Sequence, residues 1–104
     1  MYCDSNSIGV EGAKAIAECM EIMDSLKKIC MENNAIKDEG VIALSRALEE
    51  NDTLLSLHLE NNGITSKGAV AIGETLGNKY KLSKLNLNFN PIGDDGFKKI
   101  AEGL

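Results

Sequence analysis

Cys30 and His58 carry the most evident chemistry in this chain, and each is followed two positions later by a glutamate, Glu32 or Glu60. A thiol beside an imidazole can act as a nucleophile with its base. The same two groups, with the carboxylates, could instead form half of a metal site. Cys30 and His58 lie 28 positions apart. Either chemistry therefore depends on the elements that would bring them together.

A 28-residue interval runs through the whole chain. An asparagine recurs at this interval, with an isoleucine two positions after it and a glycine six positions after it. A Leu-x-x-Leu-x-Leu pattern, with Ile or Met in place of some leucines, precedes the three later asparagines. A fixed period of this length indicates a stack of similar units, which we place from about residues 6, 34, 62 and 90 after a partial strand over 1–5. The recurring asparagines are Asn6, Asn34, Asn62 and Asn90.

Each unit is predicted to hold one short strand followed by one helix. Residues 57–59 read Leu, His and Leu, an alternation that predicts a strand with its leucines facing the core. The asparagine after each strand can bond backbone groups where the chain turns, so stacked units would form an asparagine ladder. We expect Asp38, Ser66 and Asp94 to be N-cap residues of three helices, and the recurring glycine to allow a close helix-to-strand approach. We place Cys19 in or near the core.

The unit LxxLxLxxNxIxxxGxxALxxAL resembles the leucine-rich repeat of the ribonuclease-inhibitor type, which also occurs in Ran GTPase-activating protein, tropomodulin and NOD-like receptors. The resemblance covers residues 1–104 as one domain. It implies a right-handed α/β solenoid with a parallel sheet on the concave face and helices on the convex face. Ribonuclease inhibitor alternates Cys and Asn at the ladder and alternates unit lengths, whereas here all four positions are Asn and every unit has 28 residues. Binding of ribonucleases is therefore not inferred.

The resemblance implies a protein-binding scaffold whose partner lies on the concave sheet. The outward strand positions should then form three rows across neighbouring strands. Carboxylates stacked on successive strands repel one another, an arrangement that a basic partner would favour, although charges of either sign can simply solvate an exposed sheet. The three rows are Lys28, Ser56 and Lys84; Tyr2, Cys30, His58 and Asn86; and Asp4, Glu32, Glu60 and Asn88.

The same placement argues against the chemistry considered first. A flat sheet offers little to exclude water or to hold an oxyanion. Within the row of Cys30 and His58, Asn86 is the only further residue that could orient them. We therefore predict no catalytic residues, no bound metal and no cofactor.

Composition restricts the partner and the compartment. The formal net charge is -5, which disfavours nucleic acid and anionic membranes as partners. With 43% hydrophobic and 26% charged residues, no apolar run approaches the ~20 residues of a membrane span. The start of the chain lacks the features of a signal peptide. The three cysteines lack disulfide-like spacing, which predicts a reducing, cytoplasmic location.

The ends of the array, the function and the role of Phe89 leave alternatives open at this point. The ends of the array look uncapped, so the chain is expected to be a segment of a longer array or to associate with itself through exposed ends. Regulation of a small GTPase is implied only by the resemblance to Ran GTPase-activating protein. Phe89 stands where earlier units have Asn33 and Asn61, and it could anchor a partner. We expect instead that it packs over the last turn.

Overall fold

The computed structural model describes residues 8–20, 22, 26–51, 53–77 and 82–103. The partial strand expected over 1–5, together with Tyr2, Asp4 and Asn6, lies outside the described residues. Helices and strands alternate along the chain, as the repeat predicts. The elements are α1 (Gly9–Met20), β1 (Lys28–Cys30), α2 (Lys37–Glu50), β2 (Ser56–His58), α3 (Ser66–Leu76), β3 (Lys84–Asn86) and α4 (Gly93–Gly103).

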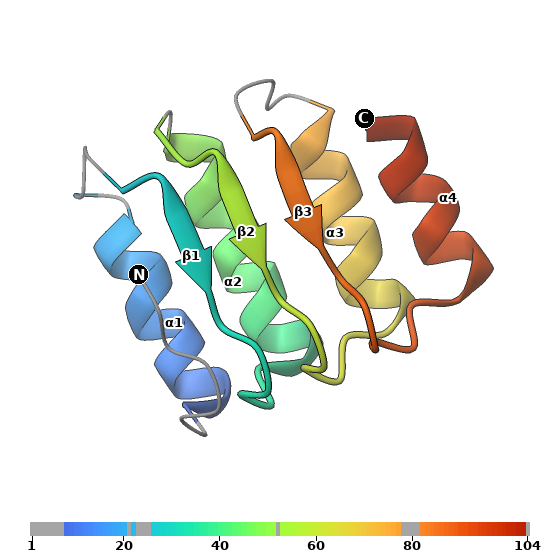
Figure 1. Ribbon diagram of the computed structural model, residues 1–104, viewed down its shortest axis with the longest axis horizontal. Helices are drawn as coiled ribbons and strands as arrows, with labels where there is room; N and C mark the ends of the chain where they lie inside the picture. Colours follow the sequence, from blue (N-terminus) through green and yellow to red (C-terminus); the bar gives the residue numbers. More distant parts are fainter. Residues whose placement is uncertain (1–7, 21, 23–25, 52, 78–81, 104) are drawn as a thin grey trace.

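The elements form two layers (Figure 1). The three strands make one parallel sheet in the order β1-β2-β3, and the helices stand side by side behind it. Each strand is therefore followed by a helix that returns the chain to the start of the next strand, as parallel pairing requires. This arrangement is the α/β solenoid that the sequence resemblance implies. Among the described residues, no helix is long and apolar enough to cross a membrane.

The core lies between the sheet and the helices. Leu57 and Leu59 point into it from β2 and the residue after it, and both are fully buried. Ala69, Ile72 and Leu76 form the buried stripe of α3, at the helical spacing that the sequence predicts. Burial of these apolar side chains is the main force that holds each unit to its neighbours.

The asparagine ladder is present between the described units. The backbone N–H of Asn34 donates to Oδ1 of Asn62 at 2.8 Å, and the N–H of Asn62 donates to Oδ1 of Asn90 at 2.7 Å. The side-chain amide of Asn62 also donates to the carbonyl of Met31 at 2.8 Å, and Asn90 makes the same bond to Leu59 at 2.8 Å. Each asparagine therefore satisfies backbone groups of the unit before it, which would otherwise be buried without partners.

The expected N-cap roles of Asp38, Ser66 and Asp94 are wrong. All three lie inside the helices, and the residue before α3 is Thr65. The Asp38 carboxylate instead accepts hydrogen bonds from the backbone N–H of Thr65 at 2.7 Å and of Gly68 at 3.1 Å, and from the Thr65 hydroxyl. It therefore caps the helix of the following unit, because its side chain extends along the stack.

This cap changes the acidity of Asp38. Partial burial alone would raise the pKa of Asp38, but the hydrogen bonds from Thr65 and Gly68, with Lys67 nearby, outweigh burial and hold the pKa below its ordinary value. The ionised form is favoured because three donors point at it. The contact between α2 and α3 thus includes a charge that the folded state stabilises.

Two other expectations need correction. A Cβ at Gly68 would lie 2.5 Å from Oδ1 of Asp38, and one at Gly96 would lie 2.8 Å from Cβ of Ala69. These glycines therefore allow neighbouring helices to approach each other closely, whereas we expected them to allow a close approach of helix to strand.

The expected burial of Cys19 is also wrong. Cys19 is exposed, although the equivalent Thr75 is buried against α2. The difference arises because no helix precedes α1 among the residues that the structure describes.

Candidate functional site on the exposed face of the sheet

The strand register places the predicted rows side by side. Lys28 pairs with Ser56 and Ser56 with Lys84, while Cys30 pairs with His58 and His58 with Asn86. Lys28 and Lys84 are exposed, and Glu32 and Glu60, just beyond the strands, are half-buried. The exposed face therefore carries lysines where the strands begin and carboxylates just after they end.

The middle row is less accessible than the sequence suggests. Cys30 is buried, and the His58 side chain is only 9% exposed. Nε2 of His58 lies 2.8 Å from Oγ of Ser56, and Nδ1 lies 3.7 Å from Oε1 of Glu60. Both ring nitrogens thus face groups other than the thiol of Cys30. The hypothesis of a Cys30 and His58 pair is not supported by this geometry.

The structure brings together a different group of side chains. One ligand atom from each of Glu32, His58 and Glu60 lies within 4.8 Å of the others. Oε1 of Glu60 is buried and has no hydrogen-bond partner among the described residues. The sequence had already placed these three residues together with Cys30 in a possible half of a metal site, since Glu32 and Glu60 occupy equivalent positions and His58 lies two residues before Glu60.

A pocket of about 360 Å³ opens beside these carboxylates. Phe89 lies at the edge of this pocket and is 85% exposed, so the expectation that its ring packs over the last turn is wrong. Its backbone has a φ of 63°, and Asn33 and Asn61 are also left-handed, at 59° and 52°. Asparagine tolerates this conformation better than phenylalanine does. The pocket is lined by Glu32, Asn33, Glu60, Asn61, Asn88 and Phe89.

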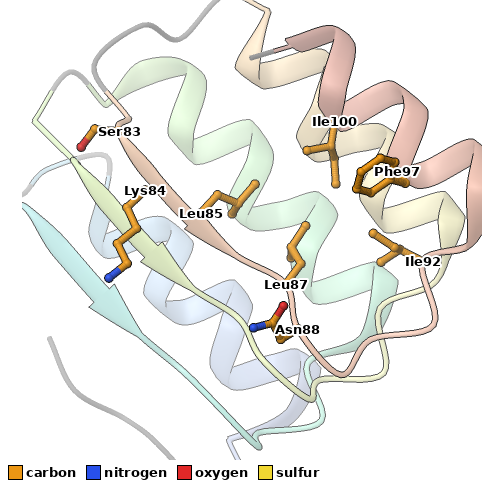
Figure 2. Close-up of a pocket in the computed structure, with 8 residues that line it drawn as sticks. All are labelled: Ser83, Lys84, Leu85, Leu87, Asn88, Ile92, Phe97 and Ile100. Carbon is orange, nitrogen blue, oxygen red and sulfur yellow. The ribbon is translucent and has the colours of Figure 1, made fainter.

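A second pocket, of about 430 Å³, lies between β3 and α4 (Figure 2). Leu85, Leu87, Ile92 and Ile100 line its apolar wall with the exposed ring of Phe97. This pocket was not predicted from the sequence. The signal was available, because Phe97 occupies the position of the small residues Val41 and Ala69 in earlier units.

Comparison with known proteins agrees with this architecture. The chain is similar to a solved structure, "Leiomodin-1 Actin-Binding Site 2 (ABS2)", with 27% sequence identity and a TM-score of 0.85 over 97% of this chain. The chain spans 60% of the length of that neighbour. No curated protein matches the chain.

A family model described as "Leucine Rich repeat" matches residues 25–45, 50–73 and 81–101, together more than half of the chain. The matched stretches include all three strands and most of the helices that follow them. With its alternating strands and helices in one parallel stack, the chain belongs to the leucine-rich repeat family, in the ribonuclease-inhibitor type.

Proposed function

We propose that this protein binds a basic segment of a partner protein on the exposed face of its sheet. The leucine-rich repeats and the structural neighbour support a role in protein interaction. The observation that carries the finer proposal is the pocket in which Glu32 and Glu60 lie with the exposed ring of Phe89. Such a pocket offers negative charge and an aromatic surface together.

A lysine or arginine side chain matches this chemistry. The cation can pair with a carboxylate through a charge-assisted hydrogen bond, and its apolar stem or its charge can lie against the ring of Phe89. At the other end of the strands, Lys28 and Lys84 are exposed. The partner segment should therefore place basic residues beside Glu32 and Glu60, and neutral or acidic residues beside the lysines.

A short peptide that alternates Lys and Arg with small residues tests this proposal. Its binding, followed by fluorescence anisotropy, should be saturable and should weaken as salt increases. We expect Glu32→Lys to weaken binding at least tenfold, because an attraction becomes a repulsion. Glu74→Lys is the matched control, since Glu74 is exposed on α3, outside the pocket. Equal affinities of wild type and Glu32→Lys would refute the role of the carboxylates.

Actin is a second candidate partner, because the similar part of leiomodin-1 is named an actin-binding site. Sedimentation of the protein with actin filaments, and gel filtration with actin monomers, would test this directly. Co-migration that Phe89→Ala or Glu32→Lys abolishes would make actin the partner of the exposed sheet face. Absence of co-migration would reject actin and leave the peptide experiment to decide the general proposal. The alternative of a GTPase regulator has no support beyond the shared repeat.

A further inference from the structure

We propose that Glu32, His58 and Glu60 bind one divalent transition-metal ion, with Zn²⁺ as the best-matched ion. Their three ligand atoms converge to within 4.8 Å on the exposed face of the sheet. One imidazole and two carboxylates are suitable ligands for zinc. The proposal differs from our expectation from the sequence, which considered Cys30 and His58 with Glu32 and Glu60 as half of a metal site and predicted no bound metal.

The hydrogen bond of His58 prepares one nitrogen for a metal. Nε2 lies 2.8 Å from Oγ of Ser56, so the ring can donate its Nε2–H to that hydroxyl oxygen. Nδ1 then carries the lone pair, and it faces Oε1 of Glu60 at 3.7 Å. Metal-bound histidines are commonly held in this way, with the second nitrogen donating to a neighbouring group.

With the Nε2–H tautomer, two acceptors face each other, and a cation between them would be favourable. Donor atoms on one tetrahedral zinc lie about 3.4 Å apart, given bonds of about 2.0–2.2 Å. Nδ1 of His58 and Oε1 of Glu60 therefore need to move together by only a few tenths of an ångström from their separation of 3.7 Å. Glu32 would then complete three protein ligands.

Burial of Glu60 is an independent observation in favour of a bound cation. Its Oε1 atom is buried and lacks a hydrogen-bond partner among the described residues, an arrangement that is unfavourable unless something compensates it. The neighbouring His58 side chain is more than nine-tenths buried. A metal ion would satisfy the oxygen and pair with both carboxylates, and water would fill its remaining position. A bound metal and a basic segment would therefore compete for Glu32 and Glu60.

A proton on Nδ1 is the competing explanation, because a ring that accepts the Ser56 hydroxyl hydrogen at Nε2 would point its Nδ1–H at Glu60. The two explanations differ in what Nδ1 carries. A proton on Nδ1 needs no third group, whereas a metal recruits Glu32 as well. The role of Glu32 therefore distinguishes them.

The chain contains one histidine, which makes the experiment unambiguous. In protein labelled with ¹⁵N-histidine, the two ring nitrogens give one pair of resonances. We expect ZnCl₂ to shift the Nδ1 resonance with a saturable 1:1 profile while Nε2 remains protonated. Calorimetry without any partner peptide should give the same stoichiometry. Failure of the partner proposal would leave this result unaffected, so the two proposals are tested separately.

Matched variants assign the ligands. Glu60→Gln and Glu32→Gln keep the side-chain shape and should each weaken zinc binding at least tenfold. Ser56→Ala should weaken it by about 10- to 100-fold by removing the group that orients His58. Glu74→Gln on α3 is the control and should bind as the wild type does. Circular dichroism shows that each variant is folded.

Three results would overturn the proposal. The first is the lack of a saturable zinc-dependent shift at His58. The second is unchanged affinity in both glutamine variants, which would indicate non-specific binding to surface carboxylates. The third is a zinc-dependent shift confined to Nε2, which would contradict the orientation that Ser56 gives to the ring.

Discussion

The second and third strands carry the same core leucines in different surroundings. Leu57, within β2, and Leu59, just after it, are fully buried, whereas the equivalent Leu85 and Leu87 at β3 are half-buried. The unit sequence is nearly the same in both places. The difference is that β2 lies between two strands, while β3 pairs with one strand among the described residues. Burial in this fold is therefore a property of stacking and not of the unit itself.

The polar residues follow the same rule. Asp38 caps the helix after its own, while the equivalent Asp94 is exposed in the first turn of α4. Asn62 is buried, but Asn90 is half-buried although it makes similar hydrogen bonds. Side chains of one type thus contribute differently to stability according to whether another unit follows.

Truncation of the two leucines gives the largest expected difference. Leu57→Ala should lower the free energy of unfolding by about 3 kcal/mol, because it leaves a cavity in a fully buried site. Leu85→Ala should lower it by only about 1 kcal/mol, since less apolar area leaves the core. Urea denaturation measures both values. Equal losses would contradict the view that stacking determines the contribution of each leucine.

Removal of the two aspartates should give a smaller difference. Asp38→Ala removes the cap of α3 and should cost about 1 kcal/mol. Asp94→Ala removes only a favourable charge in the first turn of α4, worth less than about 0.5 kcal/mol. Thermal unfolding of both variants at neutral pH provides the comparison. A larger loss in Asp94→Ala would reverse the assignment of the cap.

The pH dependence sharpens the comparison of the aspartates. Because the pKa of Asp38 is lowered on folding, its stabilising contribution is present above the unfolded-state value of about 3.9. It is lost as the pH falls through the lower folded-state value. The difference in unfolding free energy between wild type and Asp38→Ala should therefore narrow below about pH 4. A difference that stays constant during acid titration would show that ionisation of Asp38 is not involved.

The smallest expected effect concerns the left-handed residue that precedes each ladder asparagine. Phe89→Asn restores the residue type of Asn33 and Asn61, and it should raise the free energy of unfolding by about 0.5 kcal/mol. The same variant should bind the basic peptide more weakly, because the exposed aromatic ring is lost. Chemical denaturation and anisotropy measure the two effects. A less stable variant would show that the Phe89 ring contributes contacts that outweigh its backbone strain.

The sequence predicted the periodic parts of the fold because they depend on spacing alone. Apolar residues equivalent to Leu57 and Ile72, and asparagines equivalent to Asn62, recur every 28 residues. Their burial and hydrogen bonding could therefore be inferred for one unit and applied to the next. The strand register followed from the same interval. It predicted that Cys30, His58 and Asn86 would be aligned, as they are.

The remaining features depend on distances that a repeat pattern does not contain. Asp38 was assigned to its own helix, because sequence spacing does not show that its carboxylate reaches Thr65 in the next unit. His58 was placed among accessible residues, although its ring is covered and its nitrogens face Ser56 and Glu60. Phe89 was expected to pack because phenylalanine is apolar. Its left-handed backbone instead leaves the ring exposed.

The asparagine ladder has a consequence for how such a gene can change. Asn34 bonds to Asn62 and Asn62 to Asn90, each across 28 residues. When one whole unit is duplicated or lost, the units that become neighbours can form the same asparagine hydrogen bonds with each other. An insertion or deletion of any other length within a strand and its turn brings a different side chain to the ladder, and backbone groups of the preceding unit lose their partner. The ladder therefore makes the 28-residue unit the natural step by which this protein can lengthen or shorten.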